Sequence, residues 1–147
     1  MAKADREARI VVVEDNMADI VLLRYALDEL DEEYELHMLR DGEEALHFVD
    51  THRRGTEQQN PCVIVLDLHL PRHSGLEVLR AIKRTPPLAH IGVVILTGSA
   101  SPKEQDEIRE LGGACLRKPT ELESYLRFAE ELMAVCRDGI SALGASV

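Results

Sequence analysis

Five side chains with complementary chemistry follow short apolar runs of the sequence. Glu14 and Asp15 come directly after the first run, and Asp67 comes directly after another. Thr97 and Lys118 follow two further runs. Carboxylate oxygens bind hard divalent cations such as Mg²⁺, which commonly bridges carboxylates to a phosphate. An ammonium and a hydroxyl suit an anionic oxygen. Together these groups are what phosphoryl transfer to a carboxylate requires, with one aspartate attacking phosphorus.

The apolar runs that precede these residues predict β-strands. Ile10–Val13, Cys62–Leu66 and Ile91–Leu96 are rich in Val and Ile and do not alternate with polar residues. This pattern is typical of strands that are buried on both faces of a parallel sheet. Ala114–Leu116 is a weaker run, and Tyr34–Leu39 is interpreted as a strand at the edge of the sheet.

Helical patterns lie between the predicted strands, and most of them begin with a capping signal. Asn16 and Asp41 are of the residue types that favour the N-cap position. Ser74, Ser101 and Thr120 each stand three residues before a glutamate, which is the pattern of a capping box. Three such boxes at regular spacing support a repeated alternation of strand and helix.

This alternation predicts an α/β protein, a three-layer αβα sandwich with a parallel sheet. Two doubly wound strand orders are plausible, and the flavodoxin-like five-stranded order 2-1-3-4-5 fits the length. In that order the first and third strands flank the switch point, so Glu14, Asp15 and Asp67 would converge beside Thr97 and Lys118. Singly, each of these residues is explained as a helix cap, a turn residue or a surface charge. The prediction rests on the whole set.

The length of 147 residues indicates one domain with one core. We expect residues 1–147 to form that domain, with a core over about 8–136 and a flexible tail at 138–147. The polar stretch Thr51–Pro61 predicts an extended loop before the third strand.

Composition argues against several classes of partner. Lys and Arg total 17 and Asp and Glu total 27, which leaves a formal net charge of −10 and disfavours nucleic-acid binding. The sequence has no apolar run long enough for a transmembrane helix and no signal-peptide pattern at its start, so we expect a cytoplasmic protein with no membrane partner. Cys62, Cys115 and Cys136 form no close pair and are expected to be buried reduced thiols.

Four sequence segments together resemble the receiver domains of two-component response regulators. They are Val12–Asn16, Val65–Pro71 with Gly75, Leu96–Gly98 and the pair at Lys118. The resemblance covers nearly the whole chain, and the combination of segments is highly specific.

The resemblance implies a phosphoacceptor and a metal site. Asp67 corresponds to the aspartate that accepts the phosphoryl group. Asp15 corresponds to the direct carboxylate ligand of Mg²⁺, and Glu14 to a carboxylate that acts largely through water. The backbone carbonyl of His69 would complete the metal shell.

The resemblance also assigns roles to the last two strand ends. Thr97 is similar to the switch hydroxyl that moves toward the phosphoryl group, and Lys118 to the lysine that binds a phosphoryl oxygen. Pro119 stands where the family often has a cis peptide bond. Cys115 is a departure, because the family usually has an aromatic residue there that couples to the threonine. We therefore expect the signal to leave the site by a route other than this coupling.

Two predicted helices differ in how much they offer to the core. The first helix, which starts after Asn16, has a wider apolar face than one core stripe needs, and the resemblance implies that part of it docks a kinase. The fourth helix, Pro102–Leu111, offers only Ile108 and Leu111 to the core and could shift on phosphorylation. The last helix has two apolar sets, one of which is a candidate homodimer surface.

As a function, the resemblance implies a stand-alone response regulator rather than an enzyme. A histidine kinase would phosphorylate Asp67 in a Mg²⁺-dependent reaction, and altered protein contacts would carry the signal. Asn16–Asp19 and Gly75–Leu79 are similar to regulators that partner bacterial phytochromes. One alternative is a pseudo-receiver that binds independently of phosphorylation, which Cys115 favours. Another is a phosphatase with an aspartyl nucleophile, which would want a second acid where His69 stands.

Overall fold

The computed structural model describes residues 7–55 and 60–146, and in them five parallel strands form one sheet. The strands are β1 (Ala8–Val13), β2 (Tyr34–Leu39), β3 (Val63–Asp67), β4 (Gly92–Thr97) and β5 (Ala114–Arg117). Their order is β2-β1-β3-β4-β5, which confirms the predicted flavodoxin-like topology.

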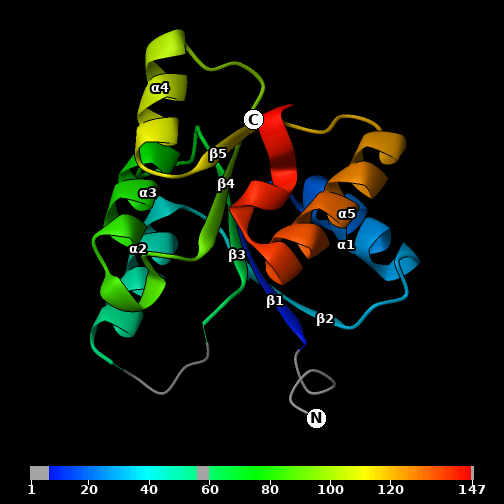
Figure 1. The fold of residues 1–147 in the computed structure, drawn as a ribbon, viewed down its shortest axis with the longest axis horizontal. Helices are drawn as coiled ribbons and strands as arrows, with labels where there is room; N and C mark the ends of the chain where they lie inside the picture. Colours follow the sequence, from blue (N-terminus) through cyan, green and yellow to red (C-terminus); the bar gives the residue numbers. More distant parts are fainter. Residues whose placement is uncertain (1–6, 56–59, 147) are drawn as a thin grey trace.

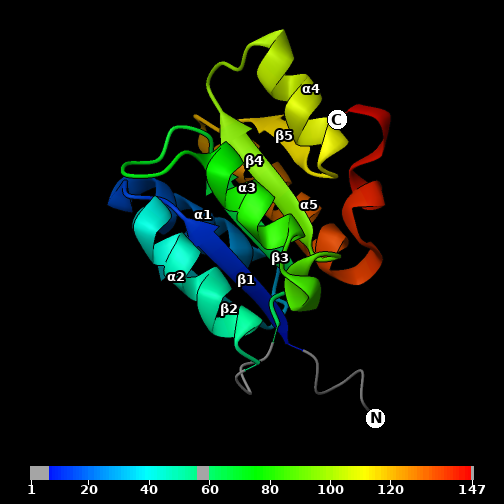
Figure 2. The same ribbon diagram turned by 90° about the vertical axis from the view of Figure 1, so that its left-hand side faces the viewer.

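Helices cover both faces of this sheet and complete the three predicted layers. They are α1 (Met17–Glu29), α2 (Gly42–Arg53), α3 (Gly75–Lys83), α4 (Pro102–Glu110) and α5 (Leu122–Asp138), with short 3₁₀ turns η1 (Pro86–Leu88) and η2 (Ile140–Ser146). In Figure 1, α1 and α5 lie on one side of the sheet and α2, α3 and α4 on the other. Figure 2 shows α2 and α3 in front of the sheet, with α5 behind it.

The sheet separates two apolar clusters, and this explains why its central strands do not alternate. Toward α1 and α5, β1, β3 and β4 direct Ile10, Val12, Val63, Val65 and Val94. Toward α2 and α3, the same strands direct Val11, Val13, Ile64, Leu66, Val93 and Ile95. A strand with helices on both faces buries every side chain, so its sequence is continuously apolar.

Four predicted N-cap side chains accept a backbone N–H from the first turn of their helix. These are Asn16, Asp41, Ser74 and Ser101. Of the three predicted capping boxes, the one at Ser101 is complete, because Glu104 also accepts the N–H of Ser101, whereas at Ser74 only the serine cap is formed. The box at Thr120 is wrong, because α5 starts one residue later, after Glu121, and has no side-chain cap.

The loop expected at Thr51–Pro61 is shorter than predicted. Helix α2 extends to Arg53, into the stretch interpreted as a loop, and residues 56–59 lie outside the described part of the chain. Helix α5 extends to Asp138, and η2 follows it within the segment predicted as a tail. Gly139 turns the chain with a φ of 84°, and Leu143 then packs into the core with 7% exposure. Residue 147 lies outside the described residues.

The expectation of three reduced thiols is wrong for two of them. Cys62 and Cys136 form a disulfide between the start of β3 and the end of α5, with their Cα atoms 4.9 Å apart. The approach of α5 depends on Gly92, where an added Cβ would lie 2.7 Å from Cγ1 of Val135. The two cysteines are 74 residues apart in sequence, so only the packing of α5 brings them together. Cys115 remains a free thiol.

Most of the apolar residues of α5 are buried within the chain itself. Both predicted sets are largely buried, and the buried residues of the helix are Tyr125, Phe128, Ala129, Leu132, Met133 and Val135. Leu122, at the start of the helix, remains exposed. Within the described residues, no helix combines the length and apolar character that crossing a membrane would need.

Candidate functional site

The ends of four strands meet at one edge of the sheet. β1 ends at the residue before Glu14, β3 ends on Asp67 and β4 ends on Thr97. The N–H of Lys118 donates to the carbonyl of Thr97 at 3.0 Å, so the pairing of β5 with β4 continues to the lysine. Parallel pairing therefore places side chains from residues 14, 67, 97 and 118 along the same edge.

The Lys118 ammonium lies among three carboxylates. Its Nζ atom is 2.9 Å from Oδ2 of Asp67, 3.0 Å from Oε1 of Glu14 and 3.3 Å from Oδ2 of Asp19. Asp19 belongs to the first turn of α1 and was not among the predicted site residues. Its signal in the sequence was its place three residues after the N-cap Asn16, where an acid at a helix start is ordinarily explained by the helix dipole.

Burial and an excess of negative charge control the electrostatics of this cluster. Burial raises the pKa of Glu14, which is 6% exposed, and the nearby charge of Asp67 adds to this effect. Hydrogen bonds from Lys118 and from the N–H of Asn16 (3.1 Å) oppose the rise. Burial alone would lower the pKa of Lys118, but hydrogen bonds to Asp67 and Glu14 and their charges outweigh it and raise that pKa. The lysine is therefore a permanent cation at neutral pH.

The loop after β3 orients Asp67. Oδ1 of Asp67 accepts the backbone N–H of His69 at 3.0 Å, and Oδ2 accepts a proton of Lys118. The loop packs directly on the start of α3, where the N–H of Gly75 donates to the carbonyl of Leu68 at 2.9 Å. An added Cβ at Gly75 would lie 2.6 Å from the carbonyl oxygen of Asp67. Glycine is needed at this position because there is no room for a Cβ atom. Its φ lies in an ordinary region, so backbone conformation is not the reason.

The donors of this cluster are carboxylate oxygens, which are the ligands that hard cations prefer. Glu14 and Asp67 both place an oxygen within 3.0 Å of one nitrogen, so they lie within reach of a single positive charge. Asp15 follows Glu14 in sequence but is exposed. In the described part of the chain, no three His, Cys, Asp or Glu side chains are gathered so as to hold a metal ion. The ammonium of Lys118 stands between the two carboxylates instead.

Thr97 is turned toward its own loop. The side chain is 6% exposed, and its hydroxyl donates to the carbonyl of Ser99 at 2.6 Å while accepting the Ser99 N–H at 3.0 Å. These two hydrogen bonds hold the hydroxyl within the loop that follows β4. The structure thus brings Glu14, Asp67 and Lys118 into contact and leaves Thr97 bonded elsewhere.

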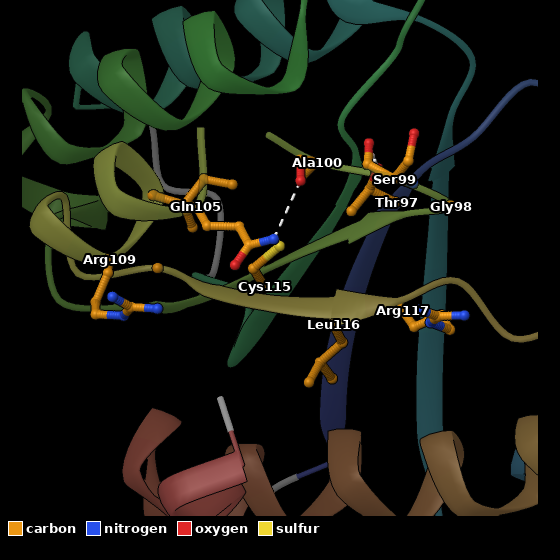
Figure 3. Close-up of a pocket in the computed structure, with 11 residues that line it drawn as sticks. Thr97, Gly98, Ser99, Ala100, Gln105, Arg109, Cys115, Leu116 and Arg117 are labelled. Atoms are coloured by element: carbon orange, nitrogen blue, oxygen red, sulfur yellow. Dashed lines mark hydrogen bonds between the residues drawn. The ribbon is translucent and has the colours of Figure 1, made fainter. Parts of the chain in front are cut away.

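A cavity of about 300 Å³ lies beside Thr97, between the loop after β4, α4 and β5. Figure 3 shows Gln105 and Arg109 reaching toward it from α4 and Cys115 lying on β5. Nε2 of Gln105 donates to the carbonyl of Ala100 at 3.1 Å. Burial raises the pKa of the Cys115 thiol. Cys115 stands at the position where the receiver resemblance implies an aromatic ring, and its small side chain leaves the adjoining space open.

The Lys118–Pro119 peptide bond is trans, because the described chain contains no cis peptide bond. The cis bond that the resemblance implies is therefore not found here. The position of Lys118 follows from its strand pairing and its carboxylate partners.

Comparison with known proteins matches residues 10–128 to the response regulator receiver domain. Response regulator Rcp1 of Synechocystis sp. is 35% identical over 122 residues, which cover 82% of this chain and 83% of Rcp1. A solved Mn²⁺-bound form of Rcp1 has a TM-score of 0.75 at 32% identity and covers 90% of this chain and 96% of its own.

Two further solved structures are similar. The phosphorylated cyanobacterial phytochrome response regulator RcpA has a TM-score of 0.78 at 30% identity and covers 90% of this chain and 96% of its own. The bacteriophytochrome response regulator AtBRR has a TM-score of 0.65 at 38% identity and covers 87% of this chain and 94% of its own.

Proposed function

The chain belongs to the response regulator receiver family, and we propose that it is a single-domain, stand-alone regulator whose Asp67 accepts a phosphoryl group from a histidine kinase. The observation that carries the proposal is the Asp67 carboxylate at the switch point, 2.9 Å from the Lys118 ammonium and beside the buried Glu14.

In the proposed reaction, a carboxylate oxygen of Asp67 attacks phosphorus. The new O–P bond forms as the P–N bond of the kinase phosphohistidine breaks, and the electron pair of that bond returns to the imidazole. The N–H of His69 holds one oxygen of Asp67 and so limits the rotation of the carboxylate. The charge of Lys118 offsets the negative charge on the phosphoryl oxygens.

A Mg²⁺ ion would be held by Glu14, Asp15, Asp67 and the backbone carbonyl of His69. When bound, it supplies further neutralisation of the phosphoryl oxygens. The carboxylate chemistry of these residues and the Mn²⁺-bound form of Rcp1 support this assignment. The raised pKa of Glu14 supports it too, because a cation would relieve the cost of burying that carboxylate.

The proposal is tested by intact-mass measurement of the protein with Mg²⁺ and a small acyl phosphate. We expect the gain of one phosphoryl group, and Asp67→Asn should abolish it. Asp106→Asn, which removes an exposed carboxylate of α4, is the matched control and should keep the gain. No gain with acyl phosphates or with a cognate kinase would refute the proposal.

For the kinase, we propose a docking surface on α1. Met17, Val21 and Tyr25 are 59%, 60% and 48% exposed, and their spacing of four residues places them along one side of the helix. The phytochrome names of RcpA and AtBRR support a bacterial phytochrome as the kinase. Val21→Asp should slow phosphotransfer from the kinase at least tenfold, as about 1.4 kcal/mol of docking energy would give. Phosphorylation by an acyl phosphate should be unaffected.

The remaining features of the proposal follow from composition and the family. We place the regulator in the cytoplasm, without a nucleic-acid or membrane partner, and assign it no enzymatic activity beyond its own phosphorylation and slow dephosphorylation. Homodimerisation remains a prediction. A phosphorylation-independent binding module is the second candidate, favoured by Cys115 and by the bonding of Thr97 to its own loop. Partner binding by the Asp67→Asn variant at full affinity would favour it.

A further inference from the structure

Asp19 contacts both the site lysine and a buried tyrosine. Its Oδ2 atom lies 3.3 Å from Nζ of Lys118, and its Oδ1 atom accepts the hydroxyl proton of Tyr125 at 3.0 Å. Asp19 comes from α1 and Tyr125 from α5, and Lys118 follows β5. One carboxylate thus links the lysine to two helices through separate oxygens.

Tyr125 holds this carboxylate firmly. Its side chain is 4% exposed and packs in the apolar cluster between the sheet, α1 and α5, so the hydroxyl has little freedom to leave Asp19. Burial, followed by the hydrogen bond to Asp19 and its charge, raises the pKa of Tyr125, so the phenol remains a hydrogen-bond donor. The geometry therefore fixes the orientation of the aspartate and leaves its second oxygen facing the lysine.

We propose that Asp19, held by Tyr125, is a positioning residue that keeps the Lys118 ammonium in the site during phosphoryl transfer. This inference rests on the proposed function. Lys118 has three carboxylate partners, and phosphoryl transfer in the presence of Mg²⁺ engages Asp67 and Glu14. Asp67 becomes an acyl phosphate, and Glu14 is an assigned metal ligand. Asp19 is the partner that neither event engages.

A lysine without such a partner would not remain in place. Its side chain has four rotatable bonds, and holding it in one conformation costs rotamer entropy. When Asp67 carries the phosphoryl group and Glu14 binds a cation, the pairing with Asp19 keeps the ammonium within reach of the phosphoryl oxygens.

A second tyrosine–aspartate pair provides a matched control. The Tyr34 hydroxyl donates to Oδ1 of Asp28 at 2.6 Å; this hydrogen bond is exposed and lies outside the site, while the tyrosine itself is half-buried. Tyr34→Phe removes the same kind of hydrogen bond as Tyr125→Phe and leaves Lys118 and its partners untouched.

The test measures the rate of phosphorylation by an acyl phosphate with Mg²⁺, followed by intact mass well below the melting temperature of every variant. We expect Asp19→Asn to be slowed about tenfold, as the loss of a hydrogen bond between charged groups would give. Tyr125→Phe should be slowed about threefold, since it loosens the aspartate without removing it. Tyr34→Phe should react at the wild-type rate.

The rate of a double variant distinguishes a positioning role of Tyr125 from a merely structural one. If Tyr125 acts through Asp19, the double variant Asp19→Asn with Tyr125→Phe should react at the rate of Asp19→Asn alone. A structural role would lower the melting temperature and leave the rate of the folded protein unchanged. A wild-type rate in Asp19→Asn, or an equal slowing by Tyr125→Phe in both backgrounds, would overturn the inference.

A spectroscopic measurement tests the contact without metal or phosphoryl group. The chain has three tyrosines and no tryptophan, so tyrosine dominates its near-ultraviolet absorption, with only weak contributions from two phenylalanines and the disulfide. Lys118→Met should shift the tyrosine band by removing the cation that shares Asp19. The shift should vanish in Tyr125→Phe and persist in Tyr34→Phe, and its absence from the otherwise wild-type chain would also overturn the inference.

The two proposals fail differently. If the wild-type chain gains no phosphoryl group, the proposed function is refuted and the positioning role with it. If the wild-type chain gains the group and Asp19→Asn gains it equally fast, the positioning role alone is refuted.

Discussion

The two sides of β5 are held in very different ways. On one side, α5 buries six residues, is joined to β3 through the disulfide of Cys136, and bonds to α1 through Tyr125. On the other side, α4 buries only Ile108 and borders the cavity beside Cys115. An ion pair between Arg80 of α3 and Glu107 adds one polar contact to α4.

The candidate site divides along the same line. Lys118 and its three carboxylates lie toward the firmly held α1 and α5, whereas Thr97 lies beside the cavity. Within the proposed function, this difference assigns a fixed geometry to the charged residues and mobility to Thr97. The charged half keeps its geometry because dense packing resists movement, and the hydroxyl half can move with α4 because few contacts oppose it.

The largest expected effect concerns the disulfide on the α5 side. The disulfide joins two cysteines that are 74 residues apart in sequence. Replacing Cys62 and Cys136 with serine should lower the free energy of unfolding by about 4 kcal/mol, because the unfolded chain is no longer constrained by the cross-link. Denaturant unfolding should show this loss. Cys115→Ser, on the α4 side, is the control and should change stability far less. Equal stability of the double serine variant and the wild type would contradict the asymmetry.

Next in size are two matched truncations, one on each side. Leu132 of α5 and Ile108 of α4 are 1% and 0% exposed. Leu132→Ala should cost about 3 kcal/mol and weaken the whole fold, whereas Ile108→Ala should cost about 2 kcal/mol because α4 can settle into the adjoining cavity. Hydrogen exchange should show protection lost mainly over α4 in the second variant. A global loss in both variants would count against a loosely held α4.

Two glutamates should respond to pH with opposite signs. Burial raises the pKa of Glu14, so its contribution to stability is present below its unfolded value of 4.5 and is lost as pH rises through the raised pKa. A backbone hydrogen bond from Ser101 lowers the pKa of Glu104, so its contribution is present above 4.5 and is lost as pH falls through the lowered pKa.

Melting temperatures of metal-free variants at pH 4 and pH 7 measure this difference. At pH 7, Glu14→Gln should melt above the wild type and Glu104→Gln below it, and both differences should shrink toward pH 4. These shifts should be smaller than those of the truncations. The same sign for both variants would show that burial is not the dominant influence on Glu14.

The smallest expected effect is that of filling the cavity. Cys115→Phe places a ring in the space of about 300 Å³, and we expect stability to change by less than about 1.5 kcal/mol. Ile95 faces Cys115 in the register of β4 and β5 and is fully buried, so Ile95→Phe is the control and should cost about 1–3 kcal/mol. Thermal melting compares the two. A large loss in Cys115→Phe would mean that α4 packs more tightly than its single buried residue indicates.

Much of the fold could be predicted because its signals are local. Continuous Val and Ile in Ile10–Val13 require burial on both faces, and the edge strand Tyr34–Leu39 was placed with its observed bounds. Asn16 and Ser101 cap their helices through contacts within three residues. The capping box at Thr120 was wrong, because the sequence pattern matches the motif but Glu121 takes the N-cap position and makes no side-chain cap.

The sequence by itself determined which chemistry the strand ends carry, since Glu14, Asp67 and Lys118 follow from strand pattern and parallel pairing alone. Only the tertiary structure decided how those groups are held. Asp19 meets Tyr125 across 106 residues of sequence, and Cys62 meets Cys136 across 74. Neither pairing has a local signal, because each depends on the angle and depth at which α5 packs on the sheet. That packing arises from many apolar contacts together, and no single residue or spacing records it.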